Sequence, residues 1–165
     1  MHIELAADGS ALVTTRSLLG QKDPGPVEET ATGIEWSDRV RLVCSRGRVA
    51  SLDELVLDGI RFDSREGGLR VTVPCGPDVR WIDRFAPPPE ERARAVETFD
   101  PRDETPDVGS RLMLEVVVPG EVISTGVLPS FGARAAHERG MASLELTVAS
   151  VRERERSVIW DVTWR

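Results

Sequence analysis

The chain has 165 residues, of which 40% are hydrophobic and 30% are charged. This is enough apolar material for one folded domain and argues against wholesale disorder. The 21 Lys and Arg residues and 28 Asp and Glu residues give a formal net charge of −7. That balance opposes binding to the phosphate backbone of a nucleic acid. We therefore expect a single domain over residues 1–165 and no nucleic-acid partner. The strand patterns described below indicate that this domain is β-rich.

The sequence carries no membrane-targeting pattern. No stretch reaches the roughly 18 uninterrupted apolar residues that a membrane-spanning helix needs. The first residues lack the basic segment and long apolar run of a secretory signal. The prediction is a cytoplasmic protein with no membrane span.

The N-terminal segment, residues 1–16, is predicted to form a β-hairpin. Ile3 and Leu5 alternate with polar residues, as in a strand with one buried face. Asp8-Gly9 is a favoured two-residue hairpin turn, and a second strand is expected over residues 11–16.

The next part of the chain carries further strand and turn patterns. Residues 40–44 alternate as a strand, and residues 45–47 are predicted to reverse the chain into a strand over residues 48–51. Residues 52–62 fit either helical spacing or a hairpin with an Asp-Gly turn, and we favour the hairpin. Residues 69–73 form a clear half-buried strand pattern.

One helix and two predicted hairpins follow. Acidic residues begin the segment 90–97 after three prolines, which favours a surface helix. Strands are predicted over residues 112–118 and 122–128, joined by a Pro-Gly turn. A long C-terminal hairpin is predicted over residues 141–165, with its turn in the charged stretch 152–156.

Together these patterns predict an all-β, mainly antiparallel fold: a barrel or sandwich of roughly ten strands with one or two short surface helices. The alternation of strands and helices that is typical of nucleotide-binding α/β folds is missing from the sequence.

Residues capable of covalent or metal chemistry are few. Cys44 and Cys75 are the two cysteines, and His2 and His137 are the two histidines; none shows the close spacing of a zinc site. Neither cysteine begins a predicted helix that would activate its thiol. We expect both thiols to be buried and reduced, although spacing alone does not exclude a disulfide. The sequence thus predicts no catalytic residue, metal or cofactor, and favours a protein that is not an enzyme.

Two groups of residues are candidates for binding. The first is an apolar stripe on one face of the last predicted strand: Val158, Trp160, Val162 and Trp164. In an interior strand the stripe would belong to the core, whereas on an exposed edge it would be a docking surface for a second chain. The second is a group of arginines around the predicted hairpin at residues 40–51: Arg39, Arg41, Arg46 and Arg48. Local positive charge can attract an anionic partner, or it can belong to an ordinary solvated face.

Segments within residues 55–128 resemble a known family. Residues 55–62 and 65–74 have the order strand, acidic and glycine-containing turn, strand; residues 115–126 have a glutamate, a Pro-Gly turn and a strand ending in glycine. These features are similar to the GIDE-type β-rich domain of the mitochondrial ubiquitin ligase activator MULAN and its prokaryotic relatives. Family members usually have flanking membrane helices, and the eukaryotic members have a RING finger, which this chain lacks. The resemblance therefore implies a non-catalytic interaction or sensing domain.

Two functional hypotheses follow. The first is a non-enzymatic protein-interaction or sensing module in an oligomer or larger bacterial complex. The second is a β-barrel that binds a small anionic ligand, with or without enzymatic activity. A flat apolar patch around Trp160 and Trp164 would favour the first, and a polar cavity holding His137 or Cys75 beside carboxylates would favour the second.

Overall fold

The structure is a computed structural model of the chain, and it describes all residues except 21–30, 37–39, 56, 58, 83–110 and 154. Within the strands over residues 17–43 it describes the backbone only.

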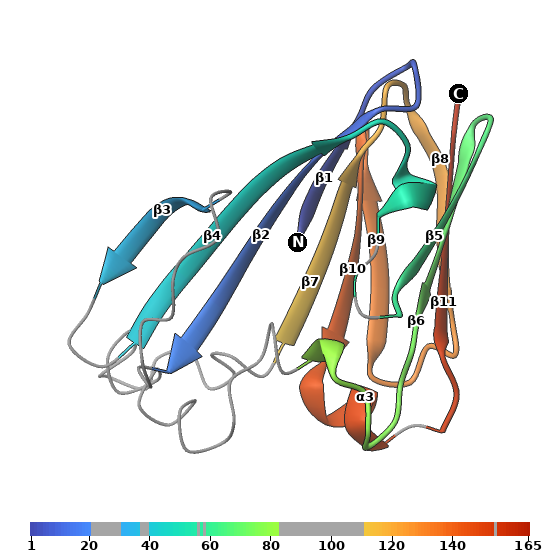
Figure 1. The fold of residues 1–165 in the computed structure, drawn as a ribbon. Coiled ribbons are helices and arrows are strands. Elements are labelled where there is room, and N and C mark those ends of the chain that lie inside the picture. Colours follow the sequence, from blue (N-terminus) through green and yellow to red (C-terminus); the bar gives the residue numbers. More distant parts are fainter. Residues whose placement is uncertain (21–30, 37–39, 56, 58, 83–110, 154) are drawn as a thin grey trace.

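Two β-sheets pack face to face (Figure 1). In chain order the strands are β1 (His2–Leu5), β2 (Ala11–Gly20), β3 (Ala31–Trp36), β4 (Val40–Val49), β5 (Arg61–Arg65), β6 (Gly68–Val73), β7 (Arg111–Val117), β8 (Val122–Leu128), β9 (Ala133–Glu138), β10 (Met141–Thr147) and β11 (Val158–Trp164). One sheet has the order β3-β4-β2-β1-β7-β10-β9, and the other has the order β5-β6-β11-β8. The predicted all-β class is confirmed, and the two sheets form a sandwich.

The core lies between the inner faces of the sheets. Successive side chains of a strand point to opposite faces, so each alternating strand places its apolar residues inward. The seven-stranded sheet contributes buried residues from β1, β7 and β10, including Ile3, Val116 and Leu144. The four-stranded sheet contributes Val71 and Trp160, which are both fully buried. On the outer faces, described side chains such as those of Arg46 in β4 and Arg70 in β6 are exposed.

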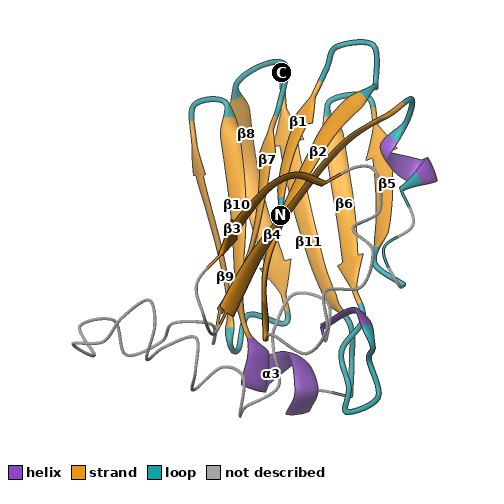
Figure 2. Ribbon diagram, turned by 60° about the vertical axis from the view of Figure 1, so that its left-hand side comes forward, coloured by secondary structure: helices purple, strands orange, loops and turns teal. Residues whose placement is uncertain are grey.

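Two connections predicted as hairpins instead join the two sheets. β7 belongs to the seven-stranded sheet and β8 to the four-stranded one, so the Pro119-Gly120 turn crosses between them. β10 and β11 are likewise in different sheets, and the helix α3 (Val148–Glu153) lies between them in the chain. Figure 2 shows α3 at one end of the sandwich, where Val151 is fully buried. The predicted hairpin over residues 141–165 is therefore wrong. Each of these strands buries one face, and a strand that faces another sheet shows the same alternation as a strand that is paired in a hairpin.

β4 is also longer than predicted. It continues through residues 45–47, where a turn was expected, because β2 pairs with it without interruption from Ala11 opposite Val49 to Gly20 opposite Val40. A continuous ladder satisfies the backbone groups that a turn would expose. The predicted hairpin at residues 40–51 is therefore wrong.

The ambiguous segment 52–62 contains both of the local structures considered. A 3-10 helix, η1 (Leu52–Glu54), begins after Ser51, whose hydroxyl accepts a hydrogen bond from the Asp53 amide at 3.3 Å. An isolated bridge then joins Leu57 to Ile60 across a turn in which Gly59 has a φ of 99°. The strand β5 follows and forms a hairpin with β6. The helix predicted over residues 90–97 lies outside the described residues.

Candidate functional site

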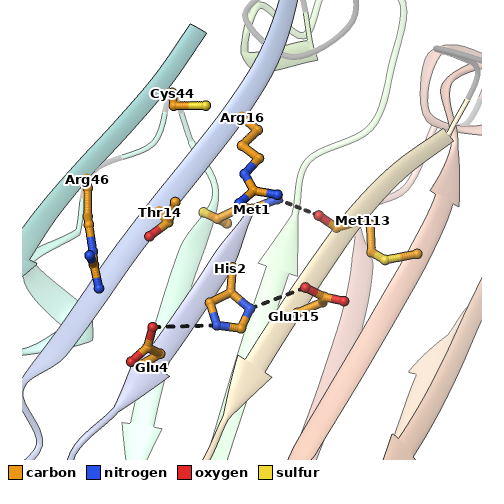
Figure 3. A pocket seen from close by; sticks show the side chains of 9 residues that line it. All are labelled: Met1, His2, Glu4, Thr14, Arg16, Cys44, Arg46, Met113 and Glu115. Atoms are coloured by element: carbon orange, nitrogen blue, oxygen red, sulfur yellow. Dashed lines mark hydrogen bonds and ion pairs between the residues drawn. The ribbon is translucent and has the colours of Figure 1, made fainter. Parts of the chain in front are cut away.

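A hollow of about 550 Å³ lies on the outer face of the seven-stranded sheet (Figure 3). Four neighbouring strands supply its lining, together with the residue that precedes β1: Met1, His2, Glu4, Thr14, Arg16, Cys44, Arg46, Met113 and Glu115. In β1 and β7 these residues alternate with buried ones such as Ile3 and Leu114. The hollow is therefore built from the side chains that the core leaves on the outer face.

The register of the sheet aligns four of these residues in one row. Arg46 of β4 is opposite Thr14 of β2, and Thr14 is opposite His2 of β1. His2 is in turn opposite Glu115 in the parallel pairing of β1 with β7. Adjacent strands are about 4.8 Å apart, so residues distant in the sequence become direct neighbours.

The imidazole of His2 lies between two carboxylates (Figure 3). Its Nδ1 is 3.2 Å from Glu115 Oε2, and its Nε2 is 3.7 Å from Glu4 Oε1. The side chains of His2 and Glu115 are each about one-third exposed. This arrangement fixes the ring and concentrates negative charge on the β1 and β7 side of the hollow.

The amino group of Met1 is held at the same side. It donates a hydrogen bond to the Met113 carbonyl at 2.6 Å, and the Glu115 amide donates to the Met1 carbonyl at 2.9 Å. Burial lowers the pKa of this amino group; the Glu115 carboxylate raises the pKa and Arg16 lowers it further. The backbone contacts extend the pairing of β1 with β7 along the wall of the hollow.

Two arginines of β2 and β4 line the hollow. Arg46 and Arg16 are both exposed there. Among the described residues, neither arginine forms an ion pair with a carboxylate. The hollow thus has Arg46 at its β4 side and the carboxylates of Glu4 and Glu115 at its β1 and β7 side, where the Met1 amino group and Arg16 also lie.

The predicted apolar stripe of the last strand lies in the core. Val158, Trp160 and Val162 expose 0%, 0% and 1% of their surface, and Trp164 packs partly buried against them. Trp160 Nε1 donates to the hydroxyl of Thr125 at 2.7 Å. β11 is an interior strand between β6 and β8. Of the two alternatives for the stripe, the structure has the core one, because neighbouring strands complete both ladders of β11.

The predicted arginine group is not assembled at a hairpin. Arg39 lies outside the described residues, and Arg41 lies in a part of β4 with only its backbone described. Arg46 and Arg48 are exposed toward the C-terminal end of β4, and Arg46 lines the hollow. The alternation in β1 indicated that His2 and Glu4 would face outward, but no sequence signal placed them beside Glu115 or Arg16.

The other candidate residues lie elsewhere. His137 is exposed in β9, and Cys75 is half-buried, with its thiol donating to the Val73 carbonyl at 3.6 Å. Cys44 is half-buried at the hollow, and Cys44 and Cys75 do not form a disulfide. In the part of the chain that the structure describes, no three His, Cys, Asp or Glu side chains are grouped as metal ligands.

A second surface feature is an exposed group of large apolar side chains, the apolar corner, formed by Leu128, Phe131 and Ile159. Their exposed fractions are 72%, 81% and 37%. Ile159 is directly opposite Leu128 in the β11–β8 ladder, and Phe131 lies in the turn that leads to β9. The apolar corner is therefore at an outer end of the four-stranded sheet, away from the buried stripe.

Comparisons with family models, curated proteins and solved structures find no match to this chain. Over the described residues, no helix combines the length and the apolar character needed to cross a lipid bilayer.

Proposed function

We propose that this chain is a non-enzymatic protein-interaction module that associates through the apolar corner. The observation that carries the proposal is the exposure of three large apolar side chains. Leu128 and Ile159 are opposite each other on adjacent strands, and Phe131 is in the turn that follows β8. Grouped apolar side chains at a surface mark interaction sites more often than single exposed ones do. Covering them with a partner would remove this apolar area from water and stabilise the complex.

The partner that the surrounding charges fit is a second copy of the chain. Next to the apolar corner, the outer face of the four-stranded sheet carries both signs of charge in one row: Asp63 is opposite Arg70, and Arg70 is opposite Asp161. A twofold dimer brings the same surface of both copies together, so that surface must complement itself. A mixed-charge face can do so, because Arg70 and Asp161 neutralise each other within each copy and do not repel the same surface of the other copy.

The resemblance to GIDE-type domains supports the same class of function. The segments that carry it correspond to the β5–β6 hairpin and to the Pro119-Gly120 turn between β7 and β8. If it reflects descent, the chain would act as a non-catalytic module in an oligomer or a larger complex, in agreement with the cytoplasmic location expected from the sequence.

The test is the mass of the protein in solution as a function of concentration, measured by sedimentation equilibrium. The wild-type mass is expected to rise toward that of a dimer, and the double variant Leu128→Ser with Phe131→Ser is expected to remain a monomer. Ile123→Ser is the matched control, because Ile123 is also a large, 55% exposed apolar residue of β8 but lies outside the apolar corner. A wild-type protein that stays monomeric, or an equal loss of association in the control, would overturn the proposal.

A further inference from the structure

We infer that the hollow on the outer face of the seven-stranded sheet binds a small zwitterionic ligand. The carboxylate of the ligand would lie at the arginine side and its ammonium group at the glutamate side. This binding activity is separate from the proposed association, because the hollow and the apolar corner lie on the outer faces of different sheets.

The arginine side has the geometry of a carboxylate site. Arg46 is opposite Thr14, and Arg16 is two residues further along β2 on the same face, opposite Cys44. Diagonal neighbours on adjacent strands are about 7–8 Å apart, within reach of long side chains. In Figure 3 the Arg16 guanidinium lies beside Met1 and the Arg46 guanidinium points away from it. The hydrogen bonds to a ligand carboxylate would therefore come from Arg46, which can donate two, and from the Thr14 hydroxyl.

Several other arginines on the sheet surfaces are already paired with a carboxylate. Arg70 donates to Asp161 at 2.7 and 3.0 Å, Arg111 donates to Glu145 at 2.6 Å, and Arg165 donates to Glu121 at 3.3 Å. Among the residues with described side chains, Arg16 and Arg46 have no such carboxylate. A ligand carboxylate would thus gain the hydrogen bonds of Arg46 without displacing a described ion pair.

The glutamate side has the chemistry of an ammonium site. His2 contacts one oxygen of Glu115 and one oxygen of Glu4, which holds both carboxylates toward the hollow. An ammonium group has three donors and no acceptor, so it can donate to the second oxygen of each carboxylate. The same carboxylates would repel a ligand that carries negative charge alone, such as phosphate.

The dimensions favour a ligand whose two charges are separated by a carbon chain. Arg46 of β4 and Glu115 of β7 are separated by three inter-strand distances, so their backbones are about 14 Å apart. The two side chains bring their charged groups closer together than that. The hollow of about 550 Å³ lies in the usual range for small-molecule sites. Met1 and Met113 add flexible apolar surface to the lining. An ω-amino acid therefore fits this charge separation better than glycine does.

The experiment is a calorimetric titration of the full chain with a matched set of probes: 6-aminohexanoate, hexanoate, hexylamine, glycine and inorganic phosphate. We expect 6-aminohexanoate to bind most tightly. Arg46→Gln should weaken its binding about tenfold, the loss expected for a charge-assisted hydrogen bond. Arg48→Gln is the matched control, because Arg48 is exposed on the same face of β4 but does not line the hollow.

The two sides of the hollow can be separated by a second variant. Glu4→Gln should weaken the binding of 6-aminohexanoate but not that of hexanoate, which does not need the glutamate side. The inference is overturned if no probe binds, if hexanoate or phosphate binds as tightly as 6-aminohexanoate, or if Arg48→Gln weakens binding as much as Arg46→Gln. Amide chemical shifts of each variant, measured without probe, report whether it is folded.

Discussion

The outer faces of the two sheets use their charges differently. On the four-stranded sheet, Arg70 and Asp161 are directly opposite each other and form two hydrogen bonds, at 2.7 and 3.0 Å. On the seven-stranded sheet, Thr14 and His2 lie between Arg46 and Glu115 in the same row. Register places Arg70 and Asp161 in contact on one face and separates Arg46 from Glu115 on the other, although Arg111 and Glu145 of that second face are paired at 2.6 Å.

This difference explains why the two faces are suited to different partners. Paired charges satisfy each other, and beside the apolar corner they leave a surface that a protein can cover without a large cost in unpaired charge. Separated charges remain able to bind the opposite charges of a small ligand. The following predictions test this comparison, beginning with the core on which both faces depend.

The largest effect is expected for the buried aromatic residue beneath the four-stranded face. Trp160→Ala should lower the free energy of unfolding by about 3–5 kcal/mol, because it leaves a cavity in a packed core. It would also remove the hydrogen bond to Thr125. Urea denaturation measures the loss. Trp164→Ala, at a partly buried position of the same strand, should cost less; an equal loss in both variants would contradict the difference in burial.

The next largest loss of stability is expected in the turn that contains Phe131 of the apolar corner. Gly132 has a φ of 63°, and an added Cβ would collide with the side chain of Ser150, whose hydroxyl donates to the Gly132 carbonyl at 3.0 Å. Gly132→Ala should therefore lower the free energy of unfolding by about 1–3 kcal/mol. Gly47→Ala in β4 is the control, since its Cβ would meet no atom within 4 Å. Thermal unfolding should show a lower Tm only for the first variant.

The charge comparison itself predicts a smaller effect. Arg70→Gln should lower the urea midpoint slightly, and less so at high salt, because it removes an exposed ion pair. The hydrogen bond from Arg70 to Asp161 also raises the pKa of Arg70. Arg46→Gln should leave the midpoint unchanged, since it breaks no ion pair among the described residues. Equal losses would show that Arg46 is already paired and would remove the contrast between the faces.

The smallest effect is expected at the β1–β2 turn, where charge is satisfied locally. Asp8 accepts hydrogen bonds from the hydroxyl and amide of Ser10, at 2.7 and 3.0 Å, and both lower the pKa of the carboxyl. A carboxyl with a lowered pKa stabilises the fold above its ordinary pKa, and the contribution is lost as pH falls through the folded-state pKa.

Ser10→Ala should raise the Asp8 pKa toward its ordinary value and make stability less sensitive to acid. Carboxyl chemical shifts followed through a pH titration measure this change. Ser64→Ala is a control on another strand, and a similar shift of the Asp8 pKa in that variant would rule out the local cause.

Most of the strands could be predicted from the sequence because their signals are local, whereas β3 and β9 were not predicted. Ile3 and Leu5 alternate with polar residues, and Asp8-Gly9 encodes the turn into β2 within a few bonds of the chain. The segments of β6, β7 and β11 show the same period of two. These patterns also indicated that His2 and Glu4 of β1 face away from the core. They therefore indicated the β1 residues of the hollow but not Glu115 of β7.

Only the tertiary structure decided which strands lie beside one another. Alternation reports that a strand has one buried face, but a neighbour in the same sheet and a strand in the facing sheet satisfy it equally. For this reason β10 and β11 were predicted as a hairpin, although they lie in different sheets, and the Trp160 stripe remained open between core and edge. The row from Arg46 to Glu115 depends on a parallel pairing between His2 and a residue 113 positions away. Such a register is set by the packing of the whole core, which no local pattern contains.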